Sequence, residues 1–316
     1  MPDASFGVVL INWNGADDTI AALDSLIAAN PLPERVIVMD NGSEDDSIAR
    51  LTDWSNDHGI DWAMTTTSSG AIDVLPWMLL VRANTNLGFS GANNVGLRFL
   101  ANHTATSHFL LLNNDAMVAP DYFAQMAAAI RQTPGAGLLA PLIYRHPEHS
   151  DIWFSGAVEI PSRALILHRT SAPASADPYP TPFVTGCAMM ISRPLYEAEG
   201  GLAEIYNPIY WEDGDYSHRA RTNGWPLLLV PGALVYHRVG GSAGGERLTP
   251  RTAFLQNRNR AIYVRRNYHG VDRLTALAYL FVTKPARAVV EMLRGNGPLG
   301  NAIFQGFWRG LTQNLA

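Results

Sequence analysis

Three carboxylates stand close together at Glu212, Asp213 and Asp215. Acids this near to one another raise each other's pKa values, and a raised pKa suits a general base. Trp211 and several tyrosines border the cluster, and aromatic faces are common platforms for sugar rings. A solvated acidic loop is the alternative, but such loops are rarely this aromatic. The segment therefore predicts acid–base chemistry on a carbohydrate.

Two other acids follow apolar runs that are typical of strands. Asp40 comes after Val36–Met39 and could accept a hydrogen bond from a uracil or thymine imide, or from ribose hydroxyls. It could equally be an Asx-turn residue that ends the strand. Asp115 closes Asn113-Asn114-Asp115, where a carboxylate is placed to bind a hard divalent cation. Such a cation would neutralise a diphosphate leaving group, although a lone aspartate there is usually a turn former.

Three weaker signals accompany these acids. Residues 86–94 place glycines before a predicted helix, whose exposed amides would favour an anion such as a diphosphate. The spacing does not fit the dinucleotide fingerprint, and an ordinary strand–helix turn is the alternative. His237 ends an apolar run and could be a metal ligand or a phosphate partner, but a lone histidine is more often structural. The single cysteine, Cys187, lies among apolar neighbours and is expected in the core.

The first part of the chain alternates between strand and helix patterns. Phe6–Ile11 and Val36–Met39 are continuous apolar runs, separated by residues with helical spacing. This alternation predicts an α/β fold with a mostly parallel sheet, in which ligands bind at the carboxyl ends of the strands. Asn12–Gly15 and Asp40–Ser43 lie at two such ends. Ser43 is expected to cap the next helix.

The later part of the chain is less regular. A strand is expected over 183–192, two short strands over 225–237, and a glycine-rich hinge over 240–245. Residues 250–316 are predicted to be mostly helical.

The composition is that of a globular protein, with 47% hydrophobic and 16% charged residues. No signal peptide is evident, and the apolar stretch Leu274–Val282 is too short to span a bilayer. With one cysteine, a cytoplasmic location is expected. Residues 245–316 carry 11 Lys+Arg against 3 Asp+Glu, while the remainder carries 12 against 25. This asymmetry suggests either a solvated basic surface or contact with a membrane or a lipid diphosphate.

Seven segments, in order, resemble the inverting family-2 glycosyltransferases of the GT-A fold, especially the bacterial rhamnosyltransferase-like branch. The match runs from about residue 6 to residue 240. The segments are VVLINWNG, VIVMDNGSED, NLGFSGANNVGL, LLLNNDA, FVTGCAMMISR, WEDGDYSHRARTNGW and VYHRVGGS.

The resemblance implies a role for each matching residue. Asp213 would be the catalytic base, with Trp211, Glu212 and Asp215 on the acceptor side. Asp115 would ligate a divalent cation, Mn²⁺ or Mg²⁺, and His237 would approach the metal or the diphosphate. The nucleoside-diphosphate sugar would lie along a set of mostly polar residues. That set is Asn12, Trp13, Asn14, Asp40, Asn86, Gly88, Asn93, Asn94 and Asn114.

The chain departs from the family pattern at two positions. Asn113 replaces the first acid of the family's DXD segment, and Asn93 stands where many relatives have arginine. With Asn113 in place of an acid, the cation would have fewer charged ligands than in those relatives.

The expected enzyme is an inverting, metal-dependent glycosyltransferase, with rhamnose as the first candidate sugar and a glycan or lipid-linked saccharide as acceptor. A GT-A domain is expected over 1–240, with a nucleotide-sugar half to 120 and an acceptor half after it. A helical region would follow over 241–316 and could contact a membrane or a second subunit. No nucleic acid partner is expected.

Three rival functions remain open from the sequence. A non-catalytic nucleotide-sugar or carbohydrate-binding protein would not need the intact Glu212-Asp213 pair. A glycoside hydrolase also uses paired carboxylates but would not need Asp40. A nucleotidyltransferase would need a basic glycine-rich loop, whereas no Lys or Arg precedes Arg35.

Overall fold

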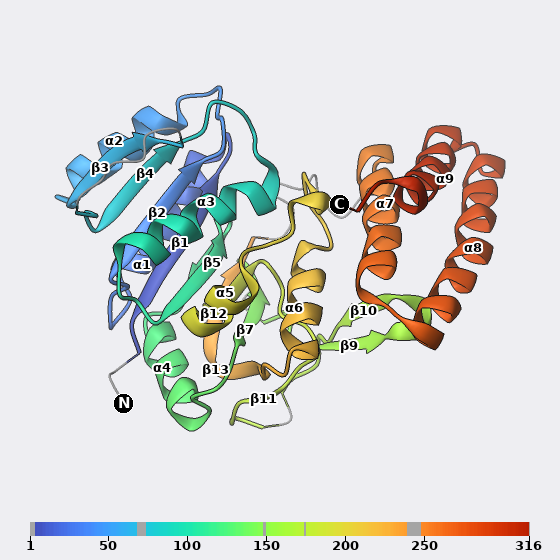
Figure 1. Ribbon diagram of the computed structural model, residues 1–316. Helices are drawn as coiled ribbons and strands as arrows, with labels where there is room; N and C mark the ends of the chain where they lie inside the picture. The colour runs from blue at the N-terminus through green and yellow to red at the C-terminus, as the bar shows by residue number, and fades with distance from the viewer. Residues whose placement is uncertain (1–3, 68–73, 148–149, 174, 239–247, 316) are drawn as a thin grey trace.

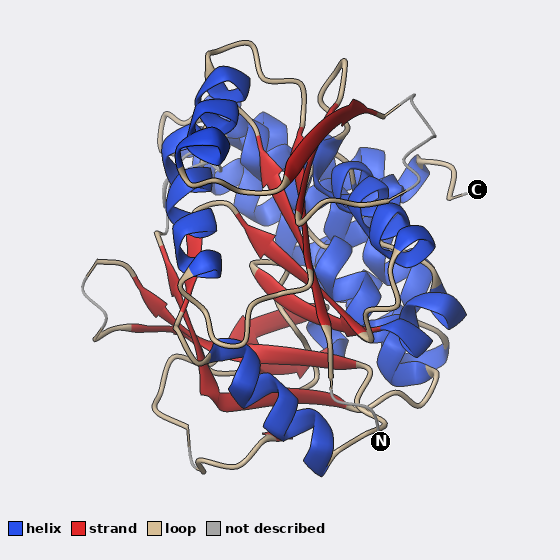
Figure 2. Cartoon of the chain, turned by 90° about the vertical axis from the view of Figure 1, so that its left-hand side faces the viewer, coloured by secondary structure: helices blue, strands red, loops and turns tan. Residues whose placement is uncertain are grey.

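One large mixed sheet organises the chain. The computed structural model describes residues 4–67, 74–147, 150–173, 175–238 and 248–315. Within these residues an eleven-stranded sheet has the main order β11-β13-β7-β12-β5-β1-β2-β4-β3, with β6 and β8 paired at its side. Helices lie on both sides of it (Figure 2).

Five parallel strands form the N-terminal part of this sheet. They are β1 (Phe6–Asn12), β2 (Arg35–Asp40), β3 (Trp62–Thr66), β4 (Met78–Arg82) and β5 (His108–Asn113). Apart from β3 they are buried apolar runs, as parallel strands covered on both faces should be. In register, Asn12 lies opposite Asp40, and Ile11 opposite Asn113. The strand ends that carry the candidate site residues therefore meet at one edge, as predicted.

Four helices connect or follow these strands. They are α1 (Ala16–Ile27), α2 (Ser47–Asp57), α3 (Gly88–His103) and α4 (Tyr122–Gln132). The prediction that Ser43 caps α2 is wrong, because α2 begins at Ser47 with Asp46 before it. The Ser43 hydroxyl instead accepts hydrogen bonds from Asn12 Nδ2 and the Asn14 amide.

The second half of the chain adds strands of mixed direction. β12 (Ala188–Ser192) lies antiparallel between β5 and β7 (Leu138–Arg145). β13 (Leu227–His237) runs parallel to β7 and antiparallel to β6 (Ala116–Val118). The two strands predicted over 225–237 are thus one strand, and its break is only a register shift between Val230 and Leu234. Likewise β12 covers only the second half of the range predicted for it.

Smaller elements complete this half. They are β8 (Ile152–Phe154), β9 (Ala157–Ile160), the 3₁₀ turn η1 (Pro161–Arg163), β10 (Leu165–His168), β11 (Tyr179–Pro180), α5 (Arg193–Glu199), η2 (Glu204–Tyr206) and α6 (Glu212–Thr222).

Three helices form the C-terminal part and stand together on one side of the molecule (Figure 1). They are α7 (Pro250–Asn267), α8 (Gly270–Leu293) and α9 (Gly297–Thr312). They share a small apolar core that includes Ile262, Leu280 and Phe307. The predicted hinge and the boundary at residue 240 fall within 239–247, outside the described residues. No helix of the described chain is both long enough and apolar enough to cross a membrane.

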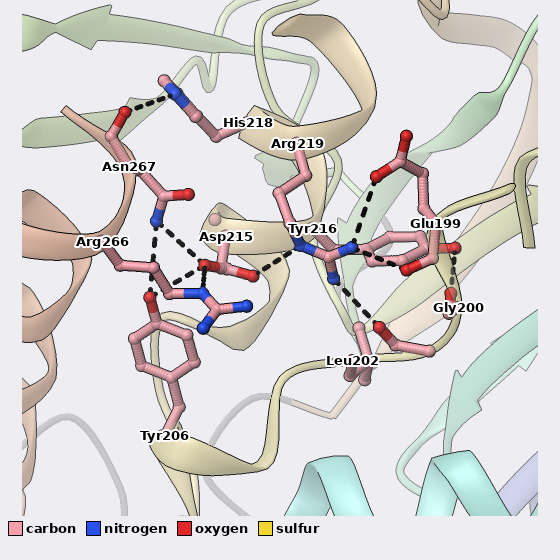
Figure 3. A network of polar contacts seen from close by, with 12 residues as sticks. Glu199, Gly200, Leu202, Tyr206, Asp215, Tyr216, His218, Arg219, Arg266 and Asn267 are labelled. Carbon is pink, nitrogen blue, oxygen red and sulfur yellow. Dashed lines mark hydrogen bonds and ion pairs between the residues drawn. The ribbon is translucent and has the colours of Figure 1, made fainter. Parts of the chain in front are cut away.

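Asp215 joins α6 to α7 (Figure 3). Its fully buried carboxylate accepts hydrogen bonds from Tyr206 Oη at 3.0 Å, Asn267 Nδ2 at 2.9 Å, Arg219 Nε at 2.9 Å and Arg266 Nε at 3.0 Å. Two arginines and two neutral donors thus satisfy one buried charge, as burial of a carboxylate requires. The C-terminal helices are fixed to α6 through this group.

Candidate active site

A cavity of about 760 Å³ lies between the start of α6, the edge of the sheet and the C-terminal helices. Trp211, Glu212, Asp213 and His237 line it, so the structure brings together four of the predicted site residues. Cys187 lines it too and is buried, as expected for a core residue. Apolar and aromatic walls with a few convergent polar groups are the usual make-up of a ligand site.

Backbone amides hold the Asp213 carboxylate in this cavity. Its Oδ2 accepts a hydrogen bond from the Gly186 amide at 3.0 Å, and its Oδ1 from the Gly214 amide at 2.8 Å. Trp211 immediately precedes α6 with a left-handed φ of 79°. This turn brings Trp211 and Asp213 to the same cavity, and the carboxylate keeps lone pairs free to accept a substrate proton.

Glu212 and Asp213 have contrasting surroundings. Glu212 is buried, and its Oε2 has no hydrogen-bond partner among the described residues. Burial first and then the Asp213 charge raise the pKa of Glu212 well above the usual value. Burial also raises the pKa of Asp213, but the amides of Gly186 and Gly214 oppose that rise. Neighbouring carboxyls whose environments push their pKa values apart take different roles. Of the two carboxyls, Asp213 is the one whose backbone donors favour the ionised form.

Asp115 and His237 meet where β6 pairs with β13. Ala116 lies opposite His237 in register, which leaves Asp115 Oδ1 at 3.2 Å from His237 Nε2. Burial alone would lower the pKa of His237, but Cys187 and Asp115 raise it to about 10. Within the described residues no group of three or more His, Cys, Asp or Glu side chains gathers as metal ligands. The pair fits a cation that takes its remaining ligands from a diphosphate and water, as Mg²⁺ commonly does.

Asn12, Asn14 and Asp40 form a second cluster, at the ends of β1 and β2. Asn12 Nδ2 donates to Asp40 Oδ1 at 2.9 Å and to Ser43 Oγ at 3.1 Å. Asp40 is fully buried and also accepts from the Ser43 amide, whereas Trp13 is 44% exposed. These residues do not line the 760 Å³ cavity. A smaller polar hollow formed by residues 42–45 and 82–85 lies beside them.

The predicted anion cradle at the start of α3 is not open. The Leu87 amide donates to Asn41 Oδ1, the Gly88 amide to Asn86 Oδ1, and the Phe89 amide to the Pro208 carbonyl. These three amides already have acceptors, so they do not provide the diphosphate site that the glycine spacing suggested.

Two asparagines of α3 also have internal partners. Asn93 Nδ2 donates to the Phe89 carbonyl within its own helix. Asn94 holds the segment after α5, because its Nδ2 donates to the Leu202 carbonyl while its Oδ1 accepts from the Leu202 amide. Neither residue lines the 760 Å³ cavity, and their place along the donor stays a prediction.

Asn114 was expected along the donor and Asp215 on the acceptor side, but both have hydrogen-bond partners within the fold. Asn114 is buried, and its amide donates to the Gly15 carbonyl and to Thr19 Oγ1, so it joins β5 to the loop before α1. Asp215 does not line the cavity and belongs to the network between α6 and α7 (Figure 3). Its place on α6, two residues from Asp213, accounts for this, because such positions lie on different faces of a helix.

Sequence reasoning missed a cationic wall of the cavity. Arg260 on α7 and both Lys284 and Arg287 on α8 line it. Trp153 packs its ring against His237 at 4.7 Å between centroids and was also missed. The sequence does show that residues 245–316 carry 11 Lys+Arg against 3 Asp+Glu. This surplus of positive charge does not show which of the basic side chains face the cavity.

The chain is similar in sequence to known glycosyltransferases. The family model described as Glycosyl transferase family 2 matches residues 7–200. The N-acetylglucosaminyl-diphospho-decaprenol L-rhamnosyltransferase of Mycobacterium tuberculosis is 25% identical over 262 residues, covering 75% of this chain and 77% of that protein. Galactofuranosyltransferase GlfT2 of the same organism is 23% identical over 258 residues, 74% of this chain and 37% of that one.

Solved structures share the fold. GalNAc-T7 with UDP, GalNAc and Mn²⁺ superimposes with a TM-score of 0.66 at 13% identity, covering 99% of this chain and 56% of that chain. The mannosyltransferase PcManGT from Pyrobaculum calidifontis, in complex with GDP-Man and Mn²⁺, gives 0.56 at 15% identity, covering 98% and 88%. The fold is GT-A, and the chain belongs to glycosyl transferase family 2 and is a glycosyltransferase.

Proposed function

We propose that this enzyme moves a sugar, with rhamnose as the first candidate, from a nucleoside-diphosphate donor to a glycan or lipid-linked acceptor, with inversion. The observation that carries the proposal is the Asp213 carboxylate, held by two amides in the cavity beside a buried Glu212. The rhamnosyltransferase relative from M. tuberculosis supports the choice of sugar.

In the proposed reaction the acceptor hydroxyl attacks the anomeric carbon of the donor. Its oxygen forms the new bond to that carbon while Asp213 takes the proton. The bond from the anomeric carbon to the phosphate oxygen breaks, and its electron pair leaves with the nucleoside diphosphate. A single displacement of this kind inverts the anomeric configuration. Trp211 would offer its face to the acceptor sugar, and the burial of Glu212 would favour its protonated form beside the base.

The donor would extend from the Asn12–Asp40 cluster toward Asp115 and His237. Asp115 and His237 would hold a Mn²⁺ or Mg²⁺ ion with the diphosphate, and that ion would offset the charge of the leaving group. Trp13 and Asn14, which lie in the loop after β1, would border the nucleoside.

The C-terminal helices are proposed as a separate unit after residue 240 that meets the cytoplasmic face of a membrane. One side of α8 carries exposed apolar side chains and is called the apolar face here: Val271, Leu274, Phe281, Val282, Val289, Met292 and Leu293. Phe304 and Trp308 of α9 are also exposed apolar side chains. An amphipathic helix with a basic balance is typical of binding in the membrane interface. Phe307, by contrast, is buried and unavailable to lipid.

A panel of nucleoside-diphosphate sugars tests the proposed reaction. Thermal shift with and without Mn²⁺ should single out one donor, and NMR of the product should show an inverted anomeric centre. Release of free sugar as the main product, with no transfer to any acceptor, would contradict the proposal. Donor binding that is indifferent to Mn²⁺ would contradict its metal dependence.

A further inference from the structure

Lys284 is the only lysine of the chain, whereas 22 arginines supply its other basic side chains. It projects from α8 into the wall of the 760 Å³ cavity and is mostly buried there. A lysine stem tolerates burial well, but its ammonium group does not unless a counter-charge meets it.

No described acidic side chain pairs with Lys284, and its charged neighbours are cations. Arg260 lies on the same wall, and its guanidinium donates to neutral carbonyl oxygens, from Nε to Ala164 at 2.9 Å and from Nη2 to Arg163 at 2.7 Å. Arg287 is the exception, because it pairs with Glu291 at 2.6 Å. The wall therefore carries positive charge that its described partners do not neutralise.

This arrangement is unfavourable without an anion. Burial lowers the pKa of Lys284 to about 8, and the charges of Arg260 and Arg287 contribute to that shift. Any bound anion would offset the repulsion and the lost hydration together. A phosphate or diphosphate group suits the wall best, since it offers several charged acceptors to ammonium and guanidinium donors.

The cationic wall lies apart from the Asn12–Asp40 cluster proposed for the nucleoside, whereas His237, proposed for the diphosphate, lines the same cavity. In Figure 1, β1 and β2 lie to the left of α6, and the C-terminal helices lie to its right. Arg260, however, approaches the Trp211 ring, with its guanidinium carbon 6.0 Å from the ring centroid. Trp211 lies two residues from Asp213, so the wall belongs to the acceptor side of the cavity.

We propose that Lys284 and Arg260 bind a phosphate or diphosphate group carried by the acceptor, and so select an anionic acceptor. This inference rests on the proposed function, because it assigns the acceptor to the Asp213 side. The acceptor hydroxyl then lies at Asp213 and the phosphate of the same molecule at the α7–α8 wall.

A protection experiment on the unmodified full chain tests this subsite without turnover. An N-hydroxysuccinimide ester of acetate should acetylate Lys284, with the α-amino group as internal control, and mass spectrometry reads both. Inorganic pyrophosphate, added with EDTA to exclude a metal-held diphosphate, should slow acetylation of Lys284 alone. Equal acetylation at every pyrophosphate concentration would overturn the proposal. Protection by phosphatidylglycerol vesicles and not by pyrophosphate would assign the wall to a lipid headgroup instead.

The KM values of variants test whether the subsite selects the acceptor. Lys284→Gln should raise KM for a diphosphate-linked acceptor about ten- to hundredfold, the range for a lost charged hydrogen bond. KM for the donor and for the same acceptor sugar as a neutral alkyl glycoside should not change, and Lys284→Arg should restore most of the loss. Arg273→Gln is the control, because it removes a charge from an exposed position of α8 outside the cavity. An equal rise in KM for charged and neutral acceptors would overturn the proposal.

The two experiments separate this inference from the proposed function. Pyrophosphate protection without sugar transfer from any nucleotide donor would contradict the function and leave the anion subsite standing. Transfer to a diphosphate-linked acceptor with Lys284 unprotected and Lys284→Gln unimpaired would overturn the subsite alone.

Discussion

Two neighbouring carboxyl groups at the start of α6 differ in what surrounds them, and the proposed roles of Asp213 and Glu212 follow from this difference. Asp213 has two backbone donors, whereas Glu212 Oε2 has none. The sequence predicted that Glu212, Asp213 and Asp215 form one cluster. It did not predict that Asp215 points away from the cavity, because this orientation depends on the formation of α6. Asn94 and Gly88 were likewise assigned to the donor, yet both contact residues 201–208, which are remote in sequence.

The acidic limb of the pH–rate profile should report Asp213. Its pKa is raised by burial, so it holds its proton to a higher pH than an ordinary aspartate. We expect kcat/KM to be maintained above that pKa and to fall tenfold per pH unit below it, with a midpoint above 3.8. A profile whose midpoint lies at or below 3.8 would remove Asp213 from the role of base.

Asp115 should govern metal-dependent donor binding. Asp115→Ala removes the one carboxylate at the proposed cation site, so calorimetry should show loss of the Mn²⁺-dependent part of nucleoside diphosphate affinity. Asp121→Ala, an exposed acid at the start of α4, is the matched control. Unchanged affinity in Asp115→Ala, or equal affinity with and without chelator in the unmutated enzyme, would contradict this role.

At the scale of elements, the parallel strands were predictable and the later ones less so. Continuous apolar runs identify β1, β2, β4 and β5, because both faces of these strands are buried. Two short strands were predicted over 225–237, but the ladder with β7 continues past Pro231-Gly232 with a changed register. Such continuity depends on the neighbouring strand, which the local sequence does not describe.

We expect Asp215 to stabilise the fold and to take no part in catalysis. Asp215→Ala leaves Arg219 and Arg266 without their buried partner, and breaking such a pair costs about 3–5 kcal/mol. Urea unfolding should show a loss of that order, while Asp53→Ala on the exposed side of α2 should show almost none. A stable Asp215→Ala enzyme with abolished turnover would show instead that Asp215 takes part in catalysis.

At the scale of the whole molecule, the C-terminal helices do two things that the sequence could not separate. The surplus of Lys and Arg over Asp and Glu in these helices can be counted in the sequence. Only the packing of the helices shows that Lys284 and Arg260 face the cavity. Their apolar residues likewise divide into a buried set around Phe307 and an exposed face on α8. This division depends on how α7, α8 and α9 dock, which is a property of the complete fold.

The exposed face of α8 should bind anionic membranes. Co-sedimentation with phosphatidylglycerol vesicles should show binding that salt weakens, and Leu293→Glu should reduce it because a charge replaces an 83% exposed apolar side chain. Leu32→Glu, also an exposed leucine but outside the C-terminal helices, is the control. No binding to neutral or anionic vesicles would reject the membrane contact, and a concentration-dependent dimer would favour a second subunit on this face.

The most direct test of the account compares Asp213→Asn with Glu212→Gln. Asparagine keeps the shape of the base but cannot take the proton, so sugar transfer should fall about 10²–10⁴-fold while donor affinity is kept. Glutamine imitates the protonated Glu212 and should retain far more activity. Near-normal transfer by Asp213→Asn, with transfer lost in Glu212→Gln, would contradict the assignment and move the base to Glu212.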